Sequence, residues 1–424
     1  MIDKTFYKRN RQSFYERMKK DSILLLFSGE ELRKTNDEYY PFFASRDFVY
    51  LTGIEQKESV LLAVKTGEGS VSERLYILPS DKLAERWTGR RLTEAEAEEI
   101  SGISDICRLG QFKDDFHRIV ASFQSPLISG MADTIYLDLY RASDRDIPLP
   151  AHHFLHHLQR EYPYLKIENA NAILRSLRLI KQPCEIEAFR KAEEITRDGI
   201  LAMMHASRPG MYEYQYKAEY DHAIGQYGPQ GPGFPSIISA GQNNFCIHYY
   251  SYHGQAHDGD MVLNDVGAQW ENHIVDVSRG WPCNGRYSDR QKLLFNCALQ
   301  TSNHMFATVR PGMRMDHIDA EIRRYNAELL KDAGVLEDVR EIGTYMWHGG
   351  AHHIGYDVHD VVMTPEILAP GMAFCIDVGI YHEEWGIGFR LEDNLLVTED
   401  GCENLSAAIP RTVEDIEAEM RKGR

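Results

Sequence analysis

Met261-Val262-Leu263-Asn264-Asp265-Val266-Gly267 has the composition of a buried β-strand but carries a carboxylate at Asp265. A second such stretch, Asn272-His273-Ile274-Val275-Asp276-Val277-Ser278, follows after a polar turn. If the two strands form a hairpin, residues whose numbers share a constant sum face each other, which places Asp265 opposite Asp276 at roughly 5 Å between Cβ atoms. Two like charges held that close in an apolar setting are costly unless a cation neutralises them. The pair therefore favours a metal site, although a single strand aspartate is more often a cap, a turn residue or a salt-bridge partner.

A histidine-rich segment flanked by glycines follows at Met346–Asp360. It contains His348, His352, His353 and His359. Imidazole is a common metal ligand and the usual proton carrier near neutral pH. Because a lone histidine is more often a core or surface residue, we do not expect all four to have a functional role.

Two further strand patterns each enclose a carboxylate. They are Ala373-Phe374-Cys375-Ile376-Asp377-Val378-Gly379 and Gly388-Phe389-Arg390-Leu391-Glu392-Asp393-Asn394-Leu395. Because side chains alternate along a strand, Arg390, Glu392 and Asn394 share one face and Asp393 points to the other. Glu392 is therefore the better ligand candidate of the two adjacent acids.

Four carboxylates and one imidazole form an oxygen-rich set of ligands. Such a set suits two hard or borderline divalent ions, with Mn²⁺ expected and Co²⁺ or Zn²⁺ as alternatives, better than it suits a thiolate zinc site. A pair of such ions can activate a water molecule and polarise a carbonyl, which is chemistry for amide hydrolysis. The sequence contains no GxGxxG after a strand, no GxxxxGK[ST], no HExxH and no GxSxG motif.

The composition narrows the possible partners and the compartment. A chain of 424 residues predicts two domains, and a formal net charge of −17 disfavours nucleic acid and membrane surfaces as partners. Seven scattered cysteines without a CxxC pair argue against a disulfide framework. The first residues lack the apolar stretch of a signal peptide, and no run reaches the roughly 20 apolar residues of a membrane helix, so we expect a cytoplasmic protein.

The two parts of the chain differ in the pattern of their predicted helices and strands. Strands are predicted at 23–27, 48–51, 60–64, 75–78 and 134–139, and helices beside them at 93–100 and 112–123. This alternation predicts a mixed α/β domain. In the second domain, helices at 185–206, 213–226, 288–308 and 316–333 bracket the acid-bearing strands. We place the domains at 1–168 and 169–424, and we read 412–424 as a charged helix or a frayed end.

The order and spacing of Asp265, Asp276, His352, Asp377 and Glu392 resemble the ligand set of the pita-bread metallopeptidases, the clan of methionine aminopeptidase, prolidase and aminopeptidase P. Four further stretches resemble sequences of the proline-specific branch of this clan: Ser239–Asn243, Ile247–Tyr249, Trp281–Gly285 and His359-Asp360. Tyr40–Phe42, Arg46–Gly53 and Trp87–Arg91 resemble the N-terminal domain of bacterial aminopeptidase P. The resemblance implies an α/β (α+β) fold, with an N-terminal mixed α/β domain before a pita-bread catalytic domain. The implied activity is removal of the residue that precedes proline from a peptide.

The resemblance also implies a role for each matched position. Asp265 would bind one metal ion, Asp276 and Glu392 would bridge two, and His352 and Asp377 would complete the second. The implied catalytic and substrate-binding residues are His248, His359, Asp377 as general base, His348, Tyr381, Arg390 and Trp87. His273 and His353 match no role and are read as structural. Proline-containing peptides are the expected partners, and a dimer or larger homo-oligomer is the expected assembly.

Two departures from the family pattern concern activity. The family has Glu-Pro-Gly where this chain has Asp377-Val378-Gly379, so the ligand and general base is shorter by one methylene, about 1.5 Å of reach. The loop Val361–Ala369 is short and lacks the arginine that aminopeptidase P has there. We still expect an active enzyme, because every other ligand position holds the expected residue type.

Two alternatives stay open at this stage. Prolidase, which is restricted to Xaa-Pro dipeptides, is the nearest, although the Trp87 segment favours aminopeptidase P. The other is a catalytically weak peptide-binding relative, since some members of the clan lost the metals; those members also lost the ligands, which this chain keeps.

Overall fold

The structure is a computed structural model that describes residues 2–121, 132–228, 230–360 and 367–423. The chain forms two compact units, Ile2–Leu177 and Arg178–Arg424, so the division lies later in the sequence than the expected boundary at 168/169. Among the described residues, no helix combines the length and the apolar character needed to cross a membrane.

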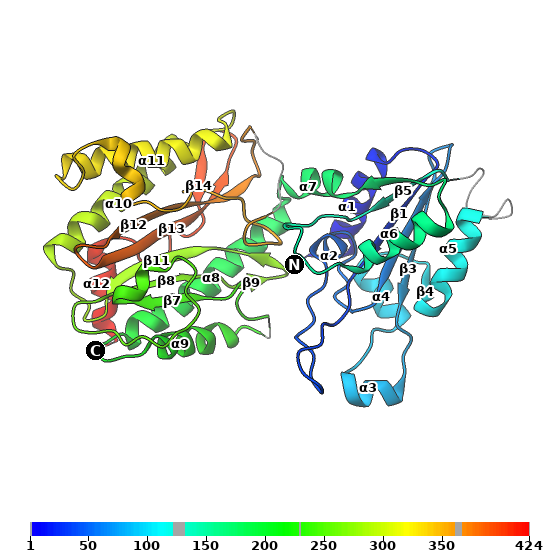
Figure 1. Cartoon of the computed structure of the whole chain (residues 1–424), viewed down its shortest axis with the longest axis horizontal. Coiled ribbons are helices and arrows are strands. Elements are labelled where there is room, and N and C mark those ends of the chain that lie inside the picture. Colours follow the sequence, from blue (N-terminus) through cyan, green and yellow to red (C-terminus); the bar gives the residue numbers. More distant parts are fainter. Residues whose placement is uncertain (1, 122–131, 229, 361–366, 424) are drawn as a thin grey trace. The chain divides into compact units, whose positions relative to one another are not determined.

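The N-terminal unit is built around a six-stranded sheet in the order β4-β3-β2-β1-β5-β6 (Figure 1). Its strands are β1 (Ser22–Phe27), β2 (Val60–Lys65), β3 (Val71–Ile77), β4 (Ile106–Arg108), β5 (Thr134–Leu137) and β6 (Lys166–Asn169). Its helices are α1 (Lys4–Arg17), α2 (Arg46–Thr52), α3 (Lys82–Thr88), α4 (Glu94–Ser101), α5 (Phe112–Ala121), α6 (Pro150–Glu161), α7 (Asn171–Arg178) and the 3₁₀ helix η1 (Leu109–Gln111). The mixed α/β domain predicted from the sequence is confirmed.

One predicted strand of this unit is wrong. The apolar run 48–51 lies in helix α2, because Ser45 caps the helix by accepting a hydrogen bond from the backbone N–H of Phe48 and Gly53 ends it with φ 70°. A short, wholly buried apolar run has no periodicity that separates strand from helix, so the two caps decide the conformation. The predicted helix at 112–123 corresponds to α5, and its last two residues lie outside the described part of the chain.

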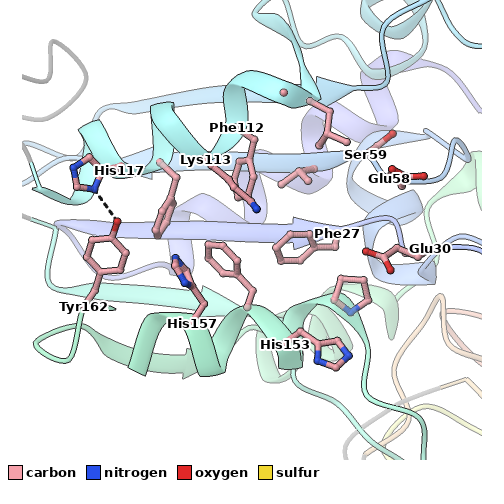
Figure 2. A pocket seen from close by; sticks show the side chains of 17 residues that line it. Phe27, Glu30, Glu58, Ser59, Phe112, Lys113, His117, His153, His157 and Tyr162 are labelled. Atoms are coloured by element: carbon pink, nitrogen blue, oxygen red, sulfur yellow. Dashed lines mark hydrogen bonds between the residues drawn. The ribbon is translucent and has the colours of Figure 1, made fainter. Parts of the chain in front are cut away.

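Helices α5 and α6 cover one face of the N-terminal sheet, and they frame a groove of about 840 Å³ (Figure 2). Phe27, Phe112, Phe116 and Phe154 form its aromatic floor. Around this floor lie His153, His157 and His117, whose Nδ1 is 2.8 Å from the hydroxyl of Tyr162. None of the metal-ligand residues predicted from the sequence lines this groove.

The C-terminal unit holds two three-stranded antiparallel sheets, ordered β11-β8-β7 and β12-β13-β14, and a two-stranded sheet of β9 and β10 (Figure 1). Strands β8, β11 and β13 of the two larger sheets contact one another. Its strands are β7 (Ile237–Ala240), β8 (Met261–Val266), β9 (Gln269–Trp270), β10 (His273–Ile274), β11 (Val277–Pro282), β12 (Ala373–His382), β13 (Ile387–Val397) and β14 (Cys402–Asn404). Its helices are α8 (Pro183–Ala206), α9 (Glu213–Gly225), α10 (Asp289–Thr308), α11 (Met315–Asp332), α12 (Val413–Lys422) and the 3₁₀ helices η2 (Gly241–Phe245) and η3 (Val339–Thr344). The four long helices and the charged C-terminal helix agree with the sequence prediction.

The predicted pairing of Asp265 with Asp276 is wrong by two residues. In the β8–β11 ladder Asp265 faces Ser278, and the short β9–β10 ladder keeps the same register. The turn sits at Glu271 and Asn272, with φ 48° and 65°, and two left-handed residues of this kind centre a two-residue hairpin. Asp276 lies in the break between the two ladders, across from Gly267. A Cβ on Gly267 would lie 1.7 Å from the carbonyl oxygen of Val275.

A buried ion pair joins the two sheets of the C-terminal unit. Arg279 and Asp393 have no exposed side-chain surface, and Arg279 Nη2 lies 2.7 Å from Asp393 Oδ1. Arg279 also donates to the backbone oxygens of Ser278, Glu392 and Pro410. Arg411 reaches the second oxygen of Asp393 at 3.0 Å.

We predict that Asp393→Asn lowers the free energy of unfolding of the C-terminal unit by roughly 3–5 kcal/mol, because it leaves a buried guanidinium without its counter-charge. Glu403→Gln is the matched control, since Glu403 pairs with Arg190 while both side chains are partly exposed, and such pairs contribute about 0–1 kcal/mol. Calorimetric unfolding of both variants checks this. Equal, small losses in the two variants would contradict the structural role of Asp393.

Candidate metal centre

The predicted acids and histidines line one cavity of about 230 Å³ in the C-terminal unit. Its lining residues are Ile247, His248, Asp265, Asp276, His348, Gly349, Ala351, His352, His359, Asp377, Arg390 and Glu392. Strand β8 supplies Asp265, the residue before β11 supplies Asp276, β12 supplies Asp377, and β13 supplies Arg390 and Glu392. The structure therefore brings together segments that are far apart in the sequence.

Strands β12 and β13 set two of the carboxylates directly opposite each other. In their ladder Asp377 faces Glu392, and alternation along β13 turns Glu392 to the cavity and Asp393 to Arg279. The hydroxyl of Ser278 donates to Glu392 Oε2 at 2.9 Å. The face shared by Arg390 and Glu392, predicted from the two-residue period of a strand, is thus observed.

One oxygen of each of the four carboxylates is buried and accepts no hydrogen bond. These atoms are Asp265 Oδ1, Asp276 Oδ1, Asp377 Oδ1 and Glu392 Oε1. Buried polar atoms are normally paired, since a missing partner costs about 1–3 kcal/mol. Four such oxygens on residues that line one small cavity are the donor set that hard divalent cations prefer, so the residues present fit metal ions.

The carboxylates also repel one another. Burial raises the pKa of Asp276 well above its ordinary value, and the negative charges of Glu392 and Asp265 raise it further. Among the described lining residues Arg390 is the one guanidinium, and its Nη2 lies 2.8 Å from Asp265 Oδ2. Burial disfavours the charge on Arg390, but Tyr381, Asp265 and Asp377 outweigh that effect and raise its pKa.

Three histidines at this cavity differ in their environments. His352 Nε2 lies 3.5 Å from Asp276 Oδ2 and 3.6 Å from Glu392 Oε1; burial lowers the pKa of His352, but Glu392 outweighs it, so the pKa is raised. His348 Nδ1 lies 3.1 Å from Asp377 Oδ2, and its Nε2 is 3.0 Å from the Tyr381 hydroxyl. Burial and then the neighbouring His352 lower the pKa of His359 to about 4, which leaves a neutral imidazole at neutral pH.

Three groups of ligand atoms lie within 4.8 Å of one another and could each hold a cation. The groups are Asp265–Asp276–Glu392, Asp276–His352–His359 and His352–Cys375–Glu392. Asp377, a predicted ligand, belongs to none of these three groups. Cys375 was not predicted as a site residue, although alternation along β12 places it on the same face as Asp377.

Two supporting contacts were not predicted either. Asn394 brackets the backbone of Asp276, since its Nδ2 donates to the Asp276 carbonyl at 2.7 Å and its Oδ1 accepts from the Asp276 N–H at 3.2 Å. Asp360, next to His359, pairs with Arg178 and Lys181. Burial raises the pKa of Asp360, but the two cations outweigh it and lower the pKa to about 2. Both contacts fix the backbone that carries cavity residues.

The remaining predicted residues lie elsewhere. Trp87 is on helix α3 of the N-terminal unit with 85% of its surface exposed, and it is not among the residues that line the metal cavity. His273 is buried with its Nε2 3.1 Å from Glu185 Oε1, and His353 is buried. Most of the loop 361–369, where the family arginine is missing, lies outside the described residues.

Paired sheets that carry such a donor set at their centre define a metallohydrolase of the pita-bread fold. The chain belongs to metallopeptidase family M24, whose model matches residues 187–399. A second model, the N-terminal domain of aminopeptidase P, matches residues 7–128. The family assignment makes this chain a metal-dependent enzyme that uses divalent ions.

Similar proteins cover the whole chain. A Bacillus anthracis structure assigned as an aminopeptidase P is 32% identical, with a TM-score of 0.95 and coverage of 100% of this chain and 99% of that one. Aminopeptidase P from Escherichia coli, solved with the inhibitor Pro-Leu, is 28% identical with a TM-score of 0.90 and the same coverage. The curated Xaa-Pro aminopeptidase of E. coli is 28% identical over 99% of this chain and 98% of its own length.

We predict that Asp276→Asn stabilises the metal-free chain, because an amide removes one of the buried charges that repel one another. A gain of about 1 kcal/mol raises Tm by about 2–4 °C in a unit of this size. Added Mn²⁺ at 100 times its Kd should increase the free energy of unfolding of the parent protein by about 2.7 kcal/mol and raise its Tm accordingly. The effect of Mn²⁺ on the variant should be much smaller. Thermal melts with chelator and with Mn²⁺ measure both effects.

Asp258→Asn is the control for this experiment, since Asp258 is an exposed aspartate of the same unit outside the cavity. It should melt like the parent protein with and without Mn²⁺. If Asp276→Asn lowers the metal-free Tm and keeps the full response to Mn²⁺, Asp276 is not part of a repelling, metal-binding cluster.

Proposed function

We propose that this chain is an Xaa-Pro aminopeptidase, which hydrolyses the bond between an N-terminal residue and a following proline. The observation that carries the proposal is the set of four buried carboxylate oxygens without hydrogen-bond partners in one cavity that histidines also line. The substrate class comes from the full-length relatives named Xaa-Pro aminopeptidase and from the E. coli structure with Pro-Leu.

The proposed cofactor is a pair of divalent ions, with Mn²⁺ expected and Co²⁺ or Zn²⁺ as alternatives. Asp265, Asp276 and Glu392 would hold one ion. His352, whose Nε2 lies 3.5 Å from Asp276 Oδ2 and 3.6 Å from Glu392 Oε1, would hold the other together with those two acids, while Asp377 is the further predicted ligand. When bound, such ions polarise the scissile carbonyl and lower the pKa of a water molecule.

The proposed proton acceptor is Asp377. Its Oδ1 accepts no hydrogen bond, and its Oδ2 lies 3.1 Å from His348 Nδ1, which is also 2.9 Å from the Gly349 carbonyl oxygen, so the contact with the imidazole leaves the other carboxylate oxygen available. Gly379 permits this arrangement, because a Cβ there would lie 2.3 Å from His348 Nε2. In the proposed reaction Asp377 Oδ1 takes a proton from the attacking water and returns it to the proline nitrogen.

Neighbouring side chains supply the remaining proposed roles. His359 and His248 line the cavity, and a neutral His359 can donate an N–H to the oxygen on which negative charge develops. Arg390 holds Asp265 and also donates to the Tyr381 hydroxyl at 3.0 Å, so both would orient ligands and substrate. Trp87 is proposed to contact substrate; its exposure leaves the indole available for such a contact.

Aminopeptidase P is favoured over prolidase by the match of residues 7–128 to the N-terminal domain of aminopeptidase P. A catalytically silent relative is disfavoured because the ligand residues are present and their oxygens are unpartnered. We also propose a cytoplasmic protein that forms a dimer or a larger assembly; seven free cysteines are in keeping with a reducing compartment, and sedimentation velocity tests the assembly.

We predict that protein treated with a chelator has no activity on Arg-Pro-Pro and that Mn²⁺ restores release of arginine. Gly-Pro should be a poorer substrate, and Arg-Ala-Ala should not be cleaved, which makes it the control for the proline requirement. Mass spectrometry of the products measures all three. Cleavage of Gly-Pro alone would identify a prolidase instead.

We predict that Asp377→Asn lowers kcat by about 10²–10⁴-fold, the range for loss of a general base, with a smaller effect on KM. Asp258→Asn is again the matched control. Circular dichroism establishes that both variants are folded. A variant with full kcat would exclude Asp377 as the proton acceptor.

A further inference from the structure

We propose that the thiol of Cys375 is a ligand of the second metal position, beside His352 and Glu392, and that Asp377 is left to act as the proton acceptor alone. The inference rests on the proposed function, because it concerns the metal centre of the same site. The family resemblance gives residue 377 two roles, metal ligand and general base. In this proposal Cys375 has the first role and Asp377 keeps the second.

The geometry of three ligand atoms supports the thiol. The sulfur of Cys375, a nitrogen of His352 and a carboxylate oxygen of Glu392 lie within 4.8 Å of one another. One point therefore lies within about 2.8 Å of all three atoms, close to metal–ligand distances of roughly 2.0–2.3 Å. Cys375 is fully buried and lies outside the set of residues that line the cavity, whereas His352 and Glu392 belong to that set.

A second observation at the same place points to a cation. Glu392 is 2% exposed, and its Oε1 accepts no hydrogen bond although its Oε2 accepts one from Ser278. His352 Nε2 lies 3.6 Å from this oxygen. A buried carboxylate oxygen without a partner, next to an imidazole and a thiol, is the environment that a divalent ion would satisfy.

The shortened acid explains why another ligand is required. Asp377 has one methylene fewer than the family glutamate, its Oδ2 lies 3.1 Å from His348, and it belongs to none of the ligand groups within 4.8 Å among the described residues. Cys375 lies two residues earlier on the same strand, and the two-residue period puts its side chain on the same face. The thiol of Cys375 thus supplies the metal ligand that the shorter side chain of Asp377 does not provide.

A sulfur ligand changes the choice of metal. Metal binding replaces the S–H bond by a sulfur–metal bond and releases the thiol proton to solvent. Thiolate suits Zn²⁺ or Co²⁺, whereas Mn²⁺ prefers oxygen donors. The position beside His352 would therefore favour Zn²⁺ or Co²⁺, and the position made by Asp265, Asp276 and Glu392 would remain an oxygen site.

The test is the absorption spectrum of the Co²⁺-loaded full chain. The parent protein should show a thiolate-to-cobalt charge-transfer band in the near ultraviolet, and Cys375→Ser should lose it and bind Zn²⁺ at least about tenfold more weakly. Cys297→Ser is the control, since Cys297 is buried on α10 outside the ligand groups, and it should keep the band. Asp377→Asn should also keep it.

Zinc X-ray absorption of the parent protein gives a result that needs no variant to fold, and a sulfur neighbour at about 2.3 Å is expected. A parent protein that binds Co²⁺ and Zn²⁺ without the band and without the sulfur neighbour overturns the inference. Hydrolysis of Arg-Pro-Pro in the same samples separates the two proposals. Activity without the sulfur signal refutes only the thiol ligand, and the sulfur signal without activity refutes only the proposed substrate.

Discussion

Repulsion among four neighbouring carboxylates, three of them on buried residues, is the constraint on which the catalytic unit depends. Asp265, Asp276, Asp377 and Glu392 line one small cavity, and each has an oxygen without a partner. Arg390 donates a hydrogen bond to the other oxygen of Asp265, and Ser278 donates one to the other oxygen of Glu392, but the four buried oxygens remain without a partner. The fold thus holds negative charges close together, which lowers the stability of the metal-free chain, and bound cations are suited to offset this repulsion. Metal binding and folding stability are therefore coupled.

Most of this arrangement could be predicted from the sequence. A carboxylate inside an apolar strand pattern is unusual enough to mark a site, and the strand period correctly separates Glu392 from Asp393. The register of Asp265 and Asp276 could not be predicted, because it depends on which two residues adopt left-handed conformations at the turn. Helix α2 was missed for a related reason, since capping at Ser45 and Gly53 is decided by local geometry that a short apolar run does not reveal.

Residues whose role depends on their neighbours in the folded chain, rather than on their residue type, also could not be predicted from the sequence. Asn394 reads as an ordinary polar strand residue, yet its amide holds both backbone groups of Asp276 and is itself held by Glu193, whose Oε1 lies 2.8 Å from Asn394 Nδ2. Cys375 reads as a core residue, because a thiolate metal site is usually recognised by paired cysteines and this one acts singly. The pairing of β12 with β13 brings Cys375 near Glu392, and the hydrogen bond from the Cys375 N–H to the His352 carbonyl, 2.9 Å, holds it beside His352.

The contacts of Arg279 have a consequence for local opening of the catalytic unit. The Arg279 guanidinium pairs with the Asp393 carboxylate of β13 and donates to carbonyls of β11, β13 and the segment before α12, so detachment of any of these segments takes a partner from a buried charge. Amide protons of these segments should then exchange with solvent in a single cooperative event rather than one by one. Exchange at the chain segment around Pro410, which does not line the metal cavity, would in that way report on the integrity of the whole centre.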